Sequence, residues 1–159
     1  MRLTQSKEQR VGLVVFVGFI TLVAASTMVQ GAPTAAPERG SFVLSLDSAA
    51  WTTPYEGPLG FPKGVQTSSL GVDPVTSGET YYARFPAGSH FEMHWHSYAE
   101  YATVLRGKVT LTLGTETHHL ADSDYVVIPA KMNHEWQVDS SGEMILLVRR
   151  DGPADFNLS

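Results

Sequence analysis

Residues 88–107 have the sequence GSHFEMHWHSYAEYATVLRG, in which three histidines and two glutamates lie between two glycines. His94 and His96 are two residues apart, so on a β-strand both side chains point to the same face of the sheet. Glu100 follows after a short break and can curve back to add a carboxylate oxygen. Imidazole and carboxylate ligands together suit a divalent transition metal such as Fe, Mn, Ni, Co, Zn or Cu. This stretch therefore predicts one edge of a metal site.

Short apolar runs broken by turn residues surround this stretch on both sides. We expect strands at 65–70, Glu79–Phe85, 91–95, 100–105, 108–113, 118–120, Tyr125–Ile128, His134–Val138 and 144–148. A further strand is expected at 42–46. No apolar 3.6-residue period occurs outside the N-terminal segment, so the sequence does not predict helices there. Many short strands at close spacing predict an all-β fold, a closed or nearly closed antiparallel barrel or jelly roll.

Composition narrows the classes of protein and of site. The chain has 159 residues, a length that indicates one domain. It has no cysteine, which excludes disulfides and thiolate metal sites. Any metal must therefore be held by nitrogen and oxygen ligands. The formal net charge is −5 and no cluster of basic residues occurs, so we expect no nucleic-acid partner.

The N-terminus differs from the rest of the chain. Basic residues precede an uncharged, mostly apolar run at 11–29, and small residues follow around Gly31. These are the features of a secretory signal peptide, although the run is also nearly long enough to anchor the chain in a membrane. In both cases the domain is exported, to the periplasm or the extracellular space. The organisation we expect is a signal peptide or anchor at 1–31, a linker at 32–40 and a β-domain at 41–159.

The histidine stretch is similar in spacing to the first cupin motif. All five fixed positions of that motif are satisfied, by Gly88, His94, His96, Glu100 and Gly107. The resemblance implies a single-domain jelly-roll β-barrel of the cupin type, with the two histidines and the glutamate as metal ligands. A wider likeness, which includes the sequence LGVDP at 70–74, is to small bacterial single-domain cupins of the ChrR type.

Residues 123–138 resemble the second cupin motif, with Pro129 and His134 at the expected positions. The resemblance implies that His134 is the fourth ligand of a three-His/one-Glu metal centre. Three positions depart from the motif: Ser123, Lys131 and Val138. The first two stand where the motif has glycine, so the departures concern turns and a strand end rather than the ligand.

Three further residues are candidates for catalysis. Arg84 could select an anionic substrate by bidentate contact, if its side chain points inward. Glu92 shares strand parity with His94 and could be an acid/base group or an extra ligand. Tyr98 could line the cavity, as could Trp136, which has the parity of His134. Ordinary barrel packing is the alternative role for each.

Two classes of function remain open at this stage. The resemblance implies an enzyme that acts on a small oxygenated compound by dioxygenase, isomerase or decarboxylase chemistry. The sequence contains no nucleophile motif and no glycine-rich phosphate loop, so we expect no cofactor beyond the metal. The alternative is a non-catalytic sensor that binds a metal or small ligand. Because exposed sheet edges favour pairing, a homodimer is also expected, with the strand at 42–46 as the pairing element.

Overall fold

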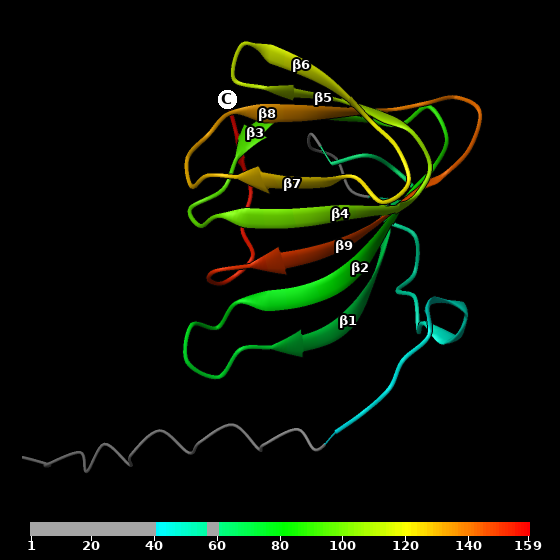
Figure 1. Cartoon of the computed structure of the whole chain (residues 1–159), viewed down its shortest axis with the longest axis vertical. Coiled ribbons are helices and arrows are strands. Elements are labelled where there is room, and N and C mark those ends of the chain that lie inside the picture. The colour runs from blue at the N-terminus through cyan, green and yellow to red at the C-terminus, as the bar shows by residue number, and fades with distance from the viewer. Residues whose placement is uncertain (1–40, 57–60) are drawn as a thin grey trace, which may run out of the picture. The chain divides into compact units, whose positions relative to one another are not determined.

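A computed structural model describes residues 41–56 and 61–159, which form two five-stranded antiparallel sheets (Figure 1). The first sheet has the order β1-β2-β9-β4-β7, with β1 at Gln66–Val72, β2 at Glu79–Phe85, β9 at Met144–Arg150, β4 at Glu100–Arg106 and β7 at Tyr125–Ile128. The second has the order β10-β3-β8-β5-β6, with β10 at Asn157–Leu158, β3 at His90–Trp95, β8 at His134–Val138, β5 at Val109–Leu113 and β6 at Glu116–Leu120. The only helix in the described residues is the short 3-10 helix η1 at Leu46–Ser48. The all-β jelly-roll prediction is confirmed.

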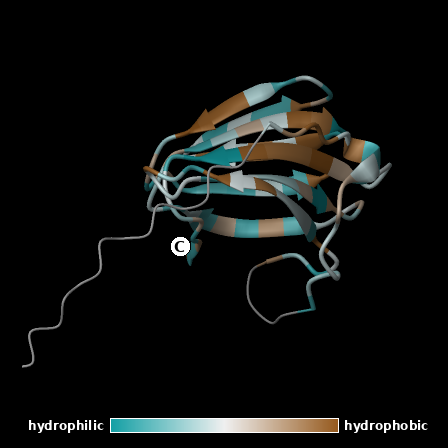
Figure 2. Ribbon diagram, turned by 90° about the horizontal axis from the view of Figure 1, so that it is seen from below, coloured by the Kyte–Doolittle hydropathy of each residue, from teal (hydrophilic) through white to brown (hydrophobic). Residues whose placement is uncertain are grey.

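Alternation of inward and outward side chains builds the core between the sheets. In β9, for example, Met144, Leu146 and Val148 are buried while Leu147 and Arg149 are less so. The second sheet contributes buried side chains as well, among them Leu111 in β5 and Trp136 in β8. Figure 2 shows the apolar stretches, in brown, along strands of both layers. Each fully buried side chain of this size stabilises the fold by about 1.5–3 kcal/mol, so the core holds the two sheets together.

The nine strands expected from 65 onward are all present, each within two residues of its expected bounds. The prediction of a strand at 42–46 was wrong. Residues 41–45 have no regular structure, and Val43 is fully exposed. The open edge at the start of β1 is instead covered by the segment before it, because Thr52 N–H donates to Thr67 O at 2.9 Å and Tyr55 N–H donates to Val65 O at 2.9 Å. A homodimer stays a prediction.

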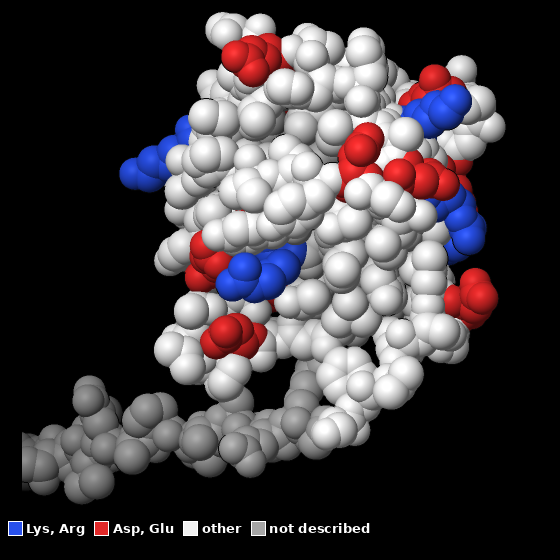
Figure 3. All heavy atoms as spheres, in the orientation of Figure 1, with Lys and Arg blue, Asp and Glu red and all other residues white. Residues whose placement is uncertain are grey.

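The expected leader at 1–31 and linker at 32–40 lie outside the described residues. Export of the domain, which was predicted from the leader, therefore stays a prediction. Among residues 41–56 and 61–159, no helix has the length and apolar character needed to span a membrane. On the face seen in Figure 3, acidic and basic side chains are interspersed and the basic ones form no single patch.

A β-bulge in β3 sets the direction of the side chains that precede His94. Phe91 pairs with Trp136, but the next regular pair is His94 with His134. Three steps along β3 therefore match two along β8, which is the signature of one extra residue. As a result Phe91 and His94 both face the core although they are three positions apart, a spacing that points side chains to opposite faces of a regular strand.

Candidate metal centre

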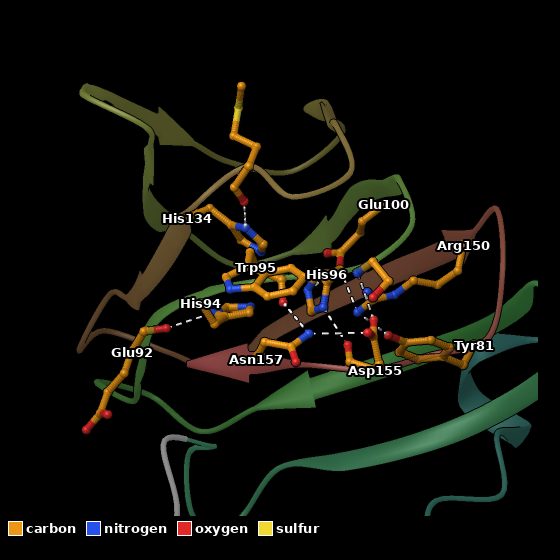
Figure 4. Close-up of polar contacts among 12 residues, drawn as sticks. Tyr81, Glu92, His94, Trp95, His96, Glu100, His134, Arg150, Asp155 and Asn157 are labelled. Atoms are coloured by element: carbon orange, nitrogen blue, oxygen red, sulfur yellow. Dashed lines mark hydrogen bonds and ion pairs between the residues drawn. The ribbon is translucent and has the colours of Figure 1, made fainter. Parts of the chain in front are cut away.

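All four predicted ligands lie together between the two sheets (Figure 4). His94 lies in β3, His96 directly follows it, Glu100 begins β4 and His134 begins β8. All four side chains are buried, with exposed fractions of 0–4%. One ring nitrogen from each of the three histidines lies within 4.8 Å of the other two, and a Glu100 Oε2 lies 3.1 Å from His96 Nε2. The structure therefore brings together residues from three strands and one loop in a single cluster.

The orientation of each imidazole is set by a hydrogen bond to the main chain. The acceptors are the carbonyl oxygens of Glu92 for His94 at 2.6 Å, Asp155 for His96 at 2.5 Å and Met132 for His134 at 3.0 Å. Because a carbonyl oxygen can only accept, each Nδ1 carries the proton and donates it. The lone pair of every ring is therefore on Nε2, the nitrogen that faces the cluster.

The three Nε2 atoms are buried and have no hydrogen-bond partner in the described part of the chain. A buried polar atom without a partner is unfavourable, and native proteins rarely keep three of them together. Three imidazole lone pairs that converge, with a carboxylate beside them, match the donor set of a divalent transition metal. These residues could hold a metal ion.

The protonation state of the histidines also suits metal binding. Burial lowers the pKa of His94 from 6.5 to about 3, and the neighbouring His134 contributes to that decrease. Burial likewise lowers the pKa of His134. Both rings are therefore neutral at physiological pH, and only the neutral imidazole can bind a metal.

Glu100 has a second charged neighbour, Arg150 at the end of β9. Arg150 Nη2 lies 2.7 Å from Glu100 Oε2, and 3.2 Å from the hydroxyl oxygen of Tyr81 in β2. Burial raises the pKa of Glu100, but the adjacent Arg150 guanidinium acts in the opposite direction, and the pKa falls from 4.5 to about 2. Burial raises the pKa of Tyr81 to about 12. Glu100 is thus an ionised group that links the histidine cluster to a buried guanidinium.

A cavity of about 350 Å³ adjoins the cluster. His96 and Glu100 belong to both the cluster and the cavity wall, and Arg150 and Tyr81 lie beside them in that wall. Much of the remaining wall is aromatic and apolar, and includes Phe61, Phe85, Phe91, Trp136, Leu146 and Phe156. The cavity therefore combines one polar region, next to the candidate metal centre, with largely apolar walls.

The catalytic candidates Arg84, Glu92 and Tyr98 do not line this cavity. Arg84 lies on the outer side of β2, where its guanidinium carbon is 4.4 Å from the centroid of the Trp51 ring. The β-bulge turns the Glu92 side chain to the exposed face, so its parity with His94 is lost. Tyr98 is 43% exposed and its ring covers Gly152. Trp136 does line the cavity, as its parity with His134 predicted.

Sequence reasoning missed Arg150, Tyr81 and Asp155. The first two carried a signal, because Arg150 has the parity of the buried Val148 in β9, and Tyr81 has the parity of Ala83 in β2. Asp155 carried none, since its contact with His96 is made by a main-chain oxygen.

Comparison with known proteins agrees with this architecture. Residues 81–149 match the family model of the cupin domain. A cupin 2 conserved barrel domain protein from Rhodopseudomonas palustris is 21% identical, with 69% of this chain and 77% of that chain covered and a TM-score of 0.59. A cupin-2 domain protein from Rhodospirillum rubrum is 18% identical over 78% of this chain and 82% of that one, with a TM-score of 0.60.

A third solved structure is the polyketide cyclase RemF from Streptomyces resistomycificus. It is 14% identical, with 75% of this chain and 85% of that chain covered and a TM-score of 0.60. At these identities the likeness shows the fold alone. No curated protein matches the chain. The narrower likeness to ChrR-type proteins stays a prediction.

Proposed function

We propose that the protein is a metal-dependent enzyme that acts on a small oxygenated compound in the adjoining cavity, since residues 81–149 match the family model of the cupin domain. The observation that carries this proposal is the set of three buried Nε2 atoms without a partner, beside a cavity of about 350 Å³. His94, His96 and His134 would hold the ion, with Glu100 as a further ligand. When bound, the metal supplies Lewis-acid or redox chemistry.

The chain's own residues would bind and orient the compound. His96 and Glu100 line both the centre and the cavity, so a molecule in the cavity lies next to the centre. The aromatic walls exclude water from its apolar part, which strengthens polar contacts at the other end. Dioxygenase, isomerase and decarboxylase chemistry remain the candidate reaction types.

The metal assignment is tested by replacing His96 with alanine. We expect wild-type protein to carry about one metal ion per chain and His96→Ala to fall to less than about a tenth of that, because the variant loses an imidazole ligand of the centre. Elemental analysis of protein purified from its native compartment measures this. The control is His119→Ala, an exposed histidine in β6, which should keep its metal. A His96→Ala protein with stoichiometric metal would contradict the assignment.

The second candidate function is a non-catalytic module that binds a metal or small ligand. One observation favours it. Glu100 and Tyr81, the two side chains that contact Arg150 in the cavity wall, have pKa values of about 2 and about 12. An efficient general acid or base has a pKa near the working pH, so neither group suits proton transfer in the state described here.

Turnover distinguishes the two functions. Protein loaded with Fe(II) or Mn(II) is incubated with a panel of small oxygenated metabolites, and oxygen consumption and product formation are followed. Product that forms with wild-type protein but not with His96→Ala supports the enzyme. Saturable binding without any turnover supports the module.

A further inference from the structure

Arg150 is the one arginine in the wall of the cavity, among the described residues, and much of its hydrogen-bonding capacity is unused. Its exposed fraction is 6%. A guanidinium offers five N–H donors in a planar fork. Nη2 contacts Glu100 and Tyr81, but Nε and Nη1 have no partner in the described part of the chain. Arg150 is therefore a buried cation in the cavity wall with two donor nitrogens that no described residue satisfies.

The neighbouring carboxylates do not satisfy these donors. Glu100 meets only Nη2, and it also lies against His96. Asp155 lines the cavity too, but its two carboxylate oxygens accept from Ser97 N–H and from the Asn157 amide. A buried charged donor without a partner is unfavourable, so a planar oxyanion placed against Nε or Nη1 would be bound strongly.

We infer that Arg150 anchors a carboxylate group of the cavity's ligand, and that the ligand is a small carboxylic acid with an apolar or aromatic remainder. The inference rests on the proposed function of the same site. The remainder of the ligand would lie against Phe91, Trp136 and Phe156, which line the same cavity. Tyr81 helps to position the guanidinium, because its hydroxyl oxygen accepts from Nη2 at 3.2 Å while Nε and Nη1 have no partner among the described residues.

The size of the cavity restricts the acid further. A volume of about 350 Å³ is near the lower end of the range for small-molecule pockets, roughly 300–1,000 Å³. A single aromatic ring with a short carboxylate chain fits within this volume.

The test compares an acid with its neutral amide. Binding of 3-phenylpropionate and of 3-phenylpropionamide to the full chain is measured by isothermal titration calorimetry. Chelator-treated protein and Zn(II)-loaded protein are both titrated. We expect the acid to bind at least about tenfold more tightly than the amide in both states, because Arg150 makes charge-assisted hydrogen bonds only to the acid.

Substitution then assigns the preference to one residue. Arg150→Met should reduce the preference for the acid to less than about twofold. Arg150→Lys keeps the charge but not the fork, and should keep only part of the preference. The matched control is Arg149→Met, because Arg149 is the preceding residue of β9 but lies outside the cavity, paired with Asp151 at 2.9 Å. It should bind the acid as the wild type does.

Three results would overturn the inference: equal binding of acid and amide by the wild type, an unchanged preference in Arg150→Met, or a preference that disappears when the metal is removed. The last would mean that the carboxylate binds the metal rather than Arg150. Metal content of every variant is measured in parallel. If Arg150→Met keeps its metal and still prefers the acid over the amide, the result contradicts this inference alone. If the wild type contains no metal, the result contradicts the proposed function.

Discussion

The histidines of the centre are neutral because they are buried, and that has a consequence for the metal-free protein in acid. The pKa of His94 is about 3 in the folded chain, against an ordinary value of 6.5. Between these values the unfolded chain binds a proton that the folded chain does not. Stability therefore rises with pH in this range and falls as the pH drops from 6.5 toward 3. Glu100 adds a loss in the same direction from pH 4.5 toward 2, since its pKa is also lowered.

We expect chelator-treated protein to lose free energy of unfolding steadily below about pH 6.5, and His94→Gln to reduce that loss. Each group that behaves this way contributes up to about 1.4 kcal/mol per pH unit. Urea unfolding between pH 7.5 and pH 5 measures the slope. His119→Gln, in which an exposed histidine is replaced, should keep the wild-type slope. An unchanged slope in His94→Gln would count against the protonation account.

Two turn residues show how far motif reasoning reaches at this scale. Ser123 and Lys131 stand where the cupin motif has glycine, and both adopt left-handed backbone, with φ of 75° and 63°. Both turns therefore adopt a conformation that glycine accommodates more readily than serine or lysine does. The Lys131 N–H donates to His96 O at 2.8 Å, so this loop also supports the end of β3.

At the scale of elements, the C-terminal segment 151–159 is part of the candidate metal centre. Its two-residue strand β10 pairs with β3 beside His94, and the main-chain oxygen of Asp155 holds His96. Phe156 packs against Phe91, with ring centroids 5.5 Å apart. The segment thus fixes an imidazole and completes the cavity wall.

We expect Phe156→Ala to weaken Zn(II) binding by about 10- to 100-fold, the usual effect of losing support for a metal ligand. Competition with a chromophoric chelator measures the affinity, and circular dichroism monitors the fold. Leu158→Ala, at a 44% exposed position in β10, is the control and should bind Zn(II) as the wild type does. Equal affinities for the two variants would show that the segment does not support the centre.

Periodicity predicted the long strands well because each buries one face. It did not predict three other features correctly. β10 has only two residues, too few for a period. The β-bulge in β3 depends on pairing with β8, which local sequence does not specify, so the direction of Glu92 was not predictable. The apolar run at 42–46 had the pattern of a strand, but the main chain that pairs with the start of β1 is that of Thr52 and Tyr55.

At the scale of the whole molecule, the centre joins the two sheets. Glu100 belongs to the first sheet, while His94 and His134 belong to the second, so an ion bound by all of them would tie the layers together. These ligands come together only in the native state. Metal binding should therefore stabilise the fold against unfolding.

We expect Zn(II) at 100 times its dissociation constant to raise the free energy of unfolding by about 2.7 kcal/mol. For a domain of this size that corresponds to an increase in Tm of roughly 10 °C. Differential scanning calorimetry with and without a chelator measures it. His96→Ala should show no increase, and a wild-type Tm that does not respond to metal would contradict a site that spans both sheets.

The ligand histidines are all oriented by main-chain oxygens, those of residues 92, 132 and 155. Every amino acid supplies such an oxygen, so evolutionary drift at these three positions can alter the side chain without removing the acceptor. Selection would then act on the histidines and leave their supports almost unmarked. A conservation profile would record the metal-binding side chains but not the framework that aims them, which only coordinates can show.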